Sequence, residues 1–177
     1  SRGWKFNLNG KYIMPVIKMD DGSMMKNSIV IKADVSGSIA IGKRHSLKIG
    51  ATLGSSLLQE EPPLSYQSFV GGQSNMNYFD NIISFDGLRF TQLYGDHIAI
   101  AKMSWQYNFY KNLYAIANVN GGYINSDYNS WFSDKSFVFG CGLTFGIETM
   151  AGPIELSLMG SNRCSDLVGF LNVGYWF

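Results

Sequence analysis

The chain has 177 residues and a net charge of +1, which suits one domain and excludes the strong basic field of a nucleic-acid-binding protein. Apolar residues make up 46% of the chain, yet the mean hydropathy is only −0.02. No segment approaches the roughly 18 consecutive apolar residues of a membrane-spanning helix. The high aromatic content of 15%, with 20 glycines and only 4 prolines, instead favours a protein built from many aromatic-rich strands.

Apolar and polar residues alternate in eight segments, as they do in β-strands that have one apolar face. In chain order these predicted strands are 4–12, 28–42, 46–57, 98–110, 113–123, 137–148, 154–159 and 168–177. The first shows the pattern clearly, with Trp4, Phe6 and Leu8 on one face and Lys5 and Asn7 on the other. Most of these segments are long enough to cross a membrane as strands, for which about 9–11 residues are needed.

Charged residues occur in the middle of several predicted strands, always on the polar face. They are Lys5, Lys32, Asp34, Lys48 and Lys102. Such charges are unfavourable in a dry protein core and favourable where they face a water-filled lumen. Aromatic residues take the apolar face near strand ends, as the girdles of an outer-membrane barrel do. They are Trp4, Trp105, Tyr107, Phe109, Tyr175 and Phe177.

The predicted connections alternate in length. The short ones lie at 43–44, 111–112 and 151–153, and the long ones at 15–27, 58–97, 125–136 and 160–167. Short turns at one end and long loops at the other are typical of a bacterial outer-membrane β-barrel, with the C-terminus on the periplasmic side. The fold class that we predict is therefore all-β, an antiparallel transmembrane β-barrel domain over 1–177. A soluble antiparallel sandwich or lipocalin-like barrel is the alternative.

The connection at 59–97 is long enough to carry a function. Its core, 69–90, is too apolar and aromatic to stay in water, so we expect it to pack against the rest of the protein. The interior of an eight-stranded barrel has room only for side chains. The loop therefore favours a larger barrel, of which these eight strands are one part.

Several motifs carry a resemblance to a known family: Gly71-Gly72 in the long loop, Phe85-Asp86-Gly87-Leu88, the stretch 92–96 that contains Gly95, and Gly152-Pro153 before the seventh strand. With three strands before the loop and five after it, the chain resembles the C-terminal half of an Omp85-superfamily barrel, the bacterial surface antigen domain. The likeness is greatest to barrels behind patatin-like phospholipase domains, the type Vd autotransporter arrangement. It implies a sixteen-stranded barrel with this loop inside the lumen.

One position departs from the family pattern. The loop of this family usually carries an arginine before the glycine, and this arginine pairs with an acidic residue of the lumen wall. Here Asp86 precedes Gly87, and the nearest arginine is Arg89. Arg89 would substitute for it with Asp34 or Glu148 as its partner, or else it is a solvated loop residue. At the other end of the chain, Gly174, Tyr175 and Phe177 resemble the C-terminal signal read by the barrel assembly machinery.

These features predict an outer-membrane translocator or anchor with a polar lumen and no catalytic site, metal site or cofactor of its own. Its partners would be outer-membrane lipid, the assembly machinery, and either a missing N-terminal half or a second copy. A self-contained eight-stranded, OmpA-like structural or adhesion barrel is the alternative. A lipid-acting enzyme that uses His97, Ser84 or Asp96 is a third. Cys141 is expected on the lipid-facing side and Cys164 in a surface loop, where a disulfide between them is conceivable.

Overall fold

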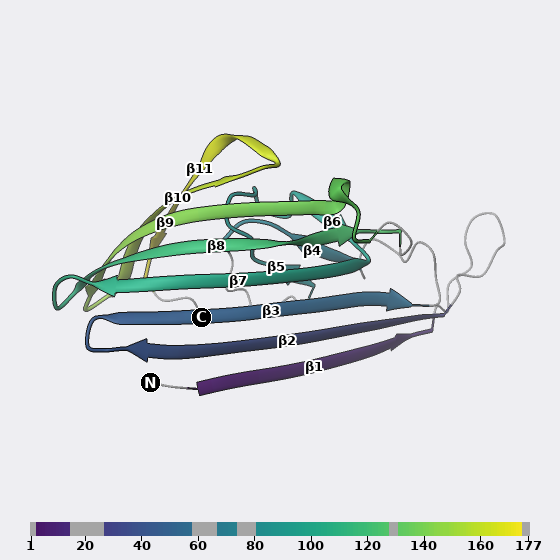
Figure 1. The fold of residues 1–177 in the computed structure, drawn as a ribbon, viewed down its shortest axis with the longest axis horizontal. Coiled ribbons are helices and arrows are strands. Elements are labelled where there is room, and N and C mark those ends of the chain that lie inside the picture. The colour runs from purple at the N-terminus through teal and green to yellow at the C-terminus, as the bar shows by residue number, and fades with distance from the viewer. Residues whose placement is uncertain (1–2, 15–26, 58–66, 74–80, 128–130, 175–177) are drawn as a thin grey trace.

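A computed structural model describes residues 3–14, 27–57, 67–73, 81–127 and 131–174. Its main element is an eight-stranded antiparallel sheet, which we call the wall (Figure 1). The wall strands, in their order across the sheet, are β1 (Gly3–Ile13), β2 (Ser28–Ile41), β3 (His45–Leu57), β7 (His97–Asn108), β8 (Leu113–Asn125), β9 (Phe137–Thr149), β10 (Gly152–Ser161) and β11 (Cys164–Val173). In the described residues, no helix is long and apolar enough to cross a membrane.

The eight predicted strands are confirmed as the wall strands, and most of their bounds differ by one to three residues. One connection is wrong. The predicted long loop at 160–167 is a tight turn at Asn162 and Arg163, because β11 begins at Cys164. The amide of Asn162 donates to Phe139 O at 3.0 Å, and its side-chain oxygen accepts from the Phe139 amide at 2.9 Å. These bonds attach the turn to β9.

The position of the turn also corrects the expectation for Cys164. The register between β10 and β11 shifts between Met159 and Ser161, so the alternation is interrupted there and the polar run that follows looks like a loop. Cys164 instead lies in β11 and pairs in register with Ser161. Cys141 is exposed on β9, and both cysteines are free.

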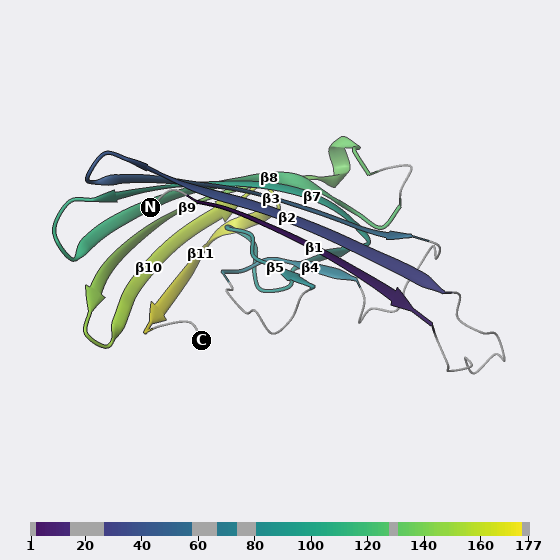
Figure 2. The ribbon, with the colours of Figure 1, turned by 90° about the horizontal axis from the view of Figure 1, so that it is seen from below.

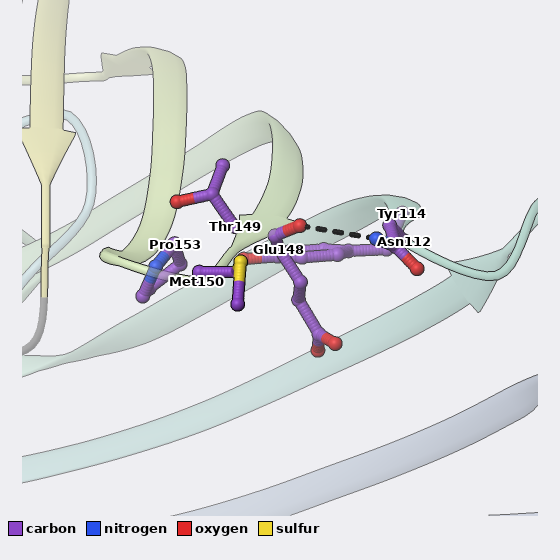
Figure 3. A pocket seen from close by; sticks show the side chains of 6 residues that line it. All are labelled: Asn112, Tyr114, Glu148, Thr149, Met150 and Pro153. Carbon is purple, nitrogen blue, oxygen red and sulfur yellow. Dashed lines mark hydrogen bonds between the residues drawn. The ribbon is translucent and has the colours of Figure 1, made fainter.

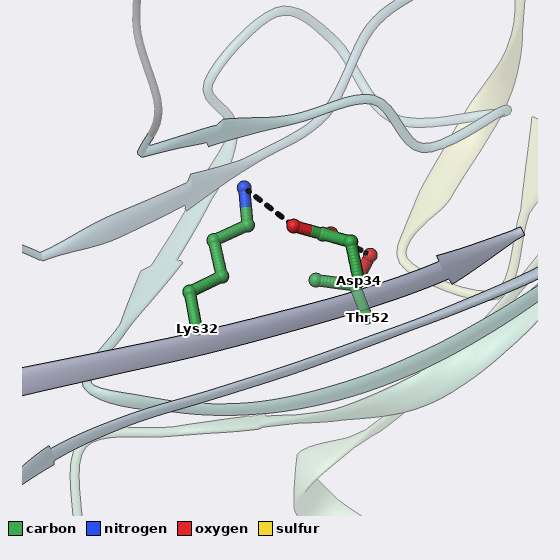
Figure 4. A network of polar contacts seen from close by, with 3 residues as sticks. All are labelled: Lys32, Asp34 and Thr52. Atoms are coloured by element: carbon green, nitrogen blue, oxygen red, sulfur yellow. Dashed lines mark hydrogen bonds and ion pairs between the residues drawn. The ribbon is translucent and has the colours of Figure 1, made fainter. Parts of the chain in front are cut away.

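The two faces of the wall have the expected opposite character. Along β1 the outer side chains of Trp4, Phe6 and Leu8 are 69%, 69% and 63% exposed, so no part of the described protein covers them. The inner face carries hydrogen-bonded polar groups. Thr52 donates to Asp34 at 2.7 Å, and Lys32 lies 3.8 Å from the same carboxylate (Figure 4).

A glycine lies opposite a large side chain in four of the strand pairings. The pairs are Trp4 with Gly37, Ile98 with Gly54, Tyr114 with Gly146, and Met159 with Gly142. In each pair a Cβ on the glycine would overlap the partner side chain. A slip in register would place the large side chain against a residue with a Cβ, so these pairs favour the observed register.

The wall is an open, curved sheet and does not close on itself. In the described residues β1 pairs only with β2, and β11 pairs only with β10. Figure 2 shows the curvature, with the strands β4 (Ser68–Val70) and β5 (Ile82–Ile83) of the long loop on the concave side. Closure of a barrel by these eight strands alone is therefore not what the structure shows.

Candidate functional site

The long loop forms a small sheet of its own. Its strands β4 (Ser68–Val70), β5 (Ile82–Ile83) and β6 (Leu93–Gly95) pair in the order β5-β4-β6, with β4 parallel to β5 and antiparallel to β6. Beyond β4 the amide of Phe85 donates to Gly72 O, and the amide of Gly72 donates to Leu88 O, both at 3.0 Å. For the described residues of the loop, 67–73 and 81–96, the expectation that they pack against the protein is confirmed, and backbone hydrogen bonds link several of them.

Apolar side chains hold the loop against the inner face of the wall. The loop contributes Val70, Ile83, Phe85 and Leu88, and the wall contributes Ile98, Ile100, Ile124 and Val138. All eight are at most 9% exposed. Complete burial of one such side chain stabilises the docked loop by about 2 kcal/mol relative to exposure of that side chain to water. The other positions of the inner face are mostly polar residues or glycines, so the apolar loop and this apolar part of the wall match each other.

The backbone of the loop lies directly on the backbone of β9 and β10. Gly87 has a φ of +87°, and a Cβ there would overlap the carbonyl of Gly160. Gly140 leaves similar room on β9, where a Cβ would overlap Asp86 O. Ser161 then donates its hydroxyl to Gly87 O at 2.8 Å. Only glycine at positions 87 and 140 allows the loop backbone to approach β9 and β10 this closely.

A chain of polar side chains runs from the loop into the wall. Gln73 donates to the Asp86 carboxylate at 3.2 Å and accepts from the Ser157 hydroxyl at 3.1 Å. Ser157 in turn shares a 2.7 Å hydrogen bond with Thr144. Ser157 and Thr144 are buried away from water, so these bonds supply hydrogen-bond partners that their hydroxyl groups would otherwise lack.

Asn120 joins the same part of the loop to β9. When the side-chain amide of Asn120 is oriented so that both its oxygen and its nitrogen form hydrogen bonds, the oxygen accepts from the Asp86 amide at 2.8 Å and the nitrogen donates to Gly140 O at 2.9 Å. The side chain is only 1% exposed. A buried amide with both ends bonded fixes the position of the loop backbone more narrowly than apolar packing does.

Lys102 supplies the positive charge at this interface. Its ammonium donates to the hydroxyl of Ser84 at 2.7 Å and also to the backbone carbonyl of Ser84. Burial raises the pKa of Asp86, while the hydrogen bond from Gln73 and the charge of Lys102 oppose that rise. We call the inner-face residues that hold the loop the docking site: Ile98, Ile100, Lys102, Asn120, Ile124, Val138, Gly140, Ser157, Gly160 and Ser161.

The predicted motif residues have different positions in this arrangement. Asp86 and Gly87 lie at the docking site. Gly71 and Gly72 have φ values of +138° and +72° and lie against the backbone of residues 89 and 90 within the loop. Gly95 packs on β8, where a Cβ would lie 3.0 Å from Asn125 O.

Arg89 does not have either of the partners expected for it. It lies 3.6 Å from Asp166, with both side chains largely exposed. Asp34 bonds to Thr52 and Lys32 in the middle of the wall. Glu148 is at the end with the short turns, where it lines a pocket of about 640 Å³ (Figure 3). The loop leaves Gly87 toward the turn at 162–163, so Arg89 emerges at the opposite end from Glu148.

The C-terminal motif is described only in part. Gly174 has a φ of +98°, and its amide donates to Pro153 O at 2.8 Å. Tyr175 and Phe177 lie outside the described residues.

The three residues considered for an enzyme have separate contacts. Ser84 binds Lys102, whereas His97 shares a 2.9 Å hydrogen bond with Ser55 and packs against Trp131 with ring centroids 5.3 Å apart and the planes tilted by 41°. The carbonyl of Asp96 accepts from the Ser56 amide at 2.9 Å. Sequence reasoning did not find the roles of Gln73, Asn120 and Ser157. A signal for the docking site was present in Ile98 and Ile100, which are apolar residues on a face that is otherwise polar.

We predict that Gly87→Ala displaces the loop. The new Cβ would have to move away from the Gly160 carbonyl, and alanine at positive φ is itself strained. Together these should weaken docking by about 2–4 kcal/mol. Limited proteolysis of the detergent-solubilised protein should then cleave within 67–96 faster. Gly42→Ala is the matched control, because Gly42 has a φ of +80° and nothing within 4 Å of its Cβ position. Equal sensitivity of both variants would contradict the close approach.

We predict that Asp86→Asn strengthens docking at neutral pH. The docked loop holds the Asp86 proton more tightly than a free loop does, because its pKa is raised. Wild-type docking should therefore tighten as the pH falls through the docked-state pKa and weaken as it rises. The pH dependence of docking is measured by the hydrogen-exchange protection of the Phe85 amide, after correction for the intrinsic exchange rate at each pH. The variant should lose the pH dependence, and Glu148→Gln should keep it. A variant less protected than wild type at neutral pH would contradict the prediction.

Comparison with known proteins agrees with this architecture. A family model described as the OMP85 superfamily matches residues 1–177. No curated protein matches the chain. Members of this superfamily are linked with assembly and translocation at the bacterial outer membrane. An open antiparallel wall with an apolar outer face and a loop on its polar concave face is consistent with part of such a barrel. The chain belongs to the OMP85 superfamily of bacterial outer-membrane β-barrel proteins.

Proposed function

We propose that this chain is one half of the wall of a sixteen-stranded translocator or anchor barrel, with the long loop docked in its lumen. The observation that carries the proposal is the three-stranded sheet of the loop on the concave face of an open wall. Eight strands that close on themselves enclose only side chains. The backbone of 67–96 would not fit inside them, so the observed docking disfavours the self-contained, OmpA-like barrel.

The two free edges of the wall support a larger barrel. In hydrocarbon the unpaired N–H and C=O groups of β1 and β11 would each be unfavourable by several kcal/mol. Because eight is an even number, β11 can pair antiparallel with the first strand of a second set of eight, and β1 with its last strand. We propose that an N-terminal half of the same polypeptide supplies that set. A second copy of this chain is the alternative, because its β1 and β11 could pair antiparallel with β11 and β1 of the first copy.

The lengths of the connections support the orientation that we propose. The turns at 42–44, 109–112 and 150–151 are short and lie together at one end of the wall, and most of the other connections are long. We place the short turns and the C-terminus on the periplasmic side, where the assembly machinery would read the terminal residues.

The resemblance to barrels behind patatin-like domains supports a role in anchoring, presenting or exporting such a domain. In this proposal any phospholipase activity belongs to the absent domain, and the chain itself catalyses no reaction. The docked loop occupies the lumen and would have to move, or leave a path beside it, for any segment to pass through.

The closure of the barrel is tested with the complete protein in detergent. We expect a mass of one copy after subtraction of the detergent, with the amides of both edge strands protected from hydrogen exchange. A mass of two copies would indicate that a second copy of the chain, and not an N-terminal half, completes the barrel. A disulfide within one chain between Asn7→Cys in β1 and Phe170→Cys in β11, in a background without native cysteines, would show eight-stranded closure and contradict the proposal.

The orientation is tested by thiol labelling of intact cells, with Cys141 and Cys164 replaced. We expect Lys135→Cys, at the end with the long loops, to react with a membrane-impermeant maleimide. Lys43→Cys, in a short turn, should react only after the outer membrane is permeabilised. The reverse pattern would place the short turns outside the cell.

A further inference from the structure

The end of the wall with the short turns carries a concentration of positive charge. Lys43 and Arg44 lie in the β2–β3 turn, and Lys111 lies in the β7–β8 turn. The turns at 42–44, 109–112 and 150–151 contain no acidic residue. All three turns lie together at the left of Figure 1. The three cations therefore lie in two neighbouring turns; the acidic residue Glu148 of β9 is also at this end, where its amide donates to Asn112 O at 2.8 Å.

A row of aromatic rings lies on the outer face at the strand ends that these turns connect. His45 stacks on Tyr107, its partner in register, with ring centroids 4.7 Å apart and an interplanar angle of 23°. It also lies parallel to the ring of Trp105 at 5.7 Å, with an interplanar angle of 5°. The ring of Phe109 continues the row, 6.1 Å from Tyr107. Trp105 and Phe109 remain 46% and 40% exposed, so the row has an open outer surface.

Backbone hydrogen bonds hold the cations and the rings in one patch. The Asn108 amide donates to Arg44 O at 2.8 Å, which places the β2–β3 turn against the end of β7. The Tyr110 amide donates to Leu113 O at 3.3 Å and closes the next turn, which carries Lys111. The patch thus consists of an aromatic surface on the outer face with a cationic border at the end of the strands.

The described part of the opposite end differs in charge. There Arg89 pairs with Asp166, and Arg163 donates to the backbone carbonyls of Lys135 and Phe137. Lys135 follows directly after Asp134 in η3 (Asp134–Ser136). Opposite charges are interspersed at this end, whereas the charged residues within the three short turns are all cations and Glu148 lies in β9 beside them.

We propose that this patch, formed by Lys43, Arg44, His45, Trp105, Tyr107, Phe109 and Lys111, binds the headgroup of an anionic phospholipid. Aromatic rings at the level of the membrane interface contact the glycerol and upper acyl region, and cations beyond them contact the phosphate. The two parts of the patch match the two parts of such a lipid. The choice of a phospholipid rests on the proposed orientation, which places the short turns in the periplasmic leaflet.

The test uses native mass spectrometry of the complete protein in detergent, titrated with phosphatidylglycerol or with zwitterionic phosphatidylcholine. Wild type should prefer phosphatidylglycerol. Lys43→Gln with Lys111→Gln should lower that preference by roughly five-fold per removed cation. The matched control is Lys11→Gln with Lys135→Gln, which removes the same charge away from the patch and should retain the wild-type preference. Trp105→Ala should weaken binding of both lipids and leave the charge preference in place.

Three results would overturn the proposal. The first is no preference for phosphatidylglycerol in wild type. The second is an equal loss in the control variant, which would reduce the effect to net charge. The third is displacement of the lipid by millimolar inorganic phosphate, which would identify a site for free anions. Tighter, patch-dependent binding of lipid A would instead assign the patch to the outer leaflet. That result would overturn the phospholipid and the proposed orientation together, whereas the first three concern the patch alone.

Discussion

Hydrocarbon offers no hydrogen-bond partner to a peptide group, and the organisation of this chain follows from that constraint. A chain that crosses the membrane as strands must pair each strand on both sides. It also needs strands of about 9–11 residues with apolar side chains facing lipid on every second position, and the wall strands have 10 to 14 residues. The exposed Trp4, Phe6 and Leu8 on β1 are unfavourable in water and appropriate in lipid. The same constraint would leave the edges of β1 and β11 unsatisfied in lipid, which is why we propose a further set of strands.

The docked loop is the second organising feature, and it depends on the first. A wall of eight strands that remains open is curved gently enough to accept a small sheet on its concave face. The attachment combines three kinds of interaction: an apolar cluster around Phe85 and Leu88, backbone contact at Gly87, and hydrogen bonds through Asn120 and Gln73. Where the family usually has an arginine on the loop, this chain has Asp86, and the cation, Lys102, is on the wall. The ammonium of Lys102 donates to Ser84, two residues before Asp86, so the cation holds the same part of the loop.

The two ends of the wall are chemically different. The end with the short turns combines a row of aromatic rings with cations. The described part of the other end has charges of both signs, among them the ion pair of Arg89 and Asp166. An asymmetry of this kind is expected for a protein whose two ends meet leaflets of different composition. It connects the proposed lipid site with the proposed orientation, since both depend on which end carries the short turns.

The alternation of apolar and polar residues was sufficient to predict the eight strands and their faces, and the apolar, aromatic content of the long loop was sufficient to predict that it packs, because each of these depends on local sequence. The turn at Asn162, the place of Cys164 in β11 and the partner of Arg89 were decided only by the tertiary structure. A register shift after Met159 hides the end of β10, and the direction in which the loop leaves Gly87 determines what Arg89 can reach. Gln73, Asn120 and Ser157 are far apart in the chain, and their hydrogen bonds exist only after the loop has docked. Local pattern therefore determined the wall, and contacts between distant segments determined the site that the wall supports.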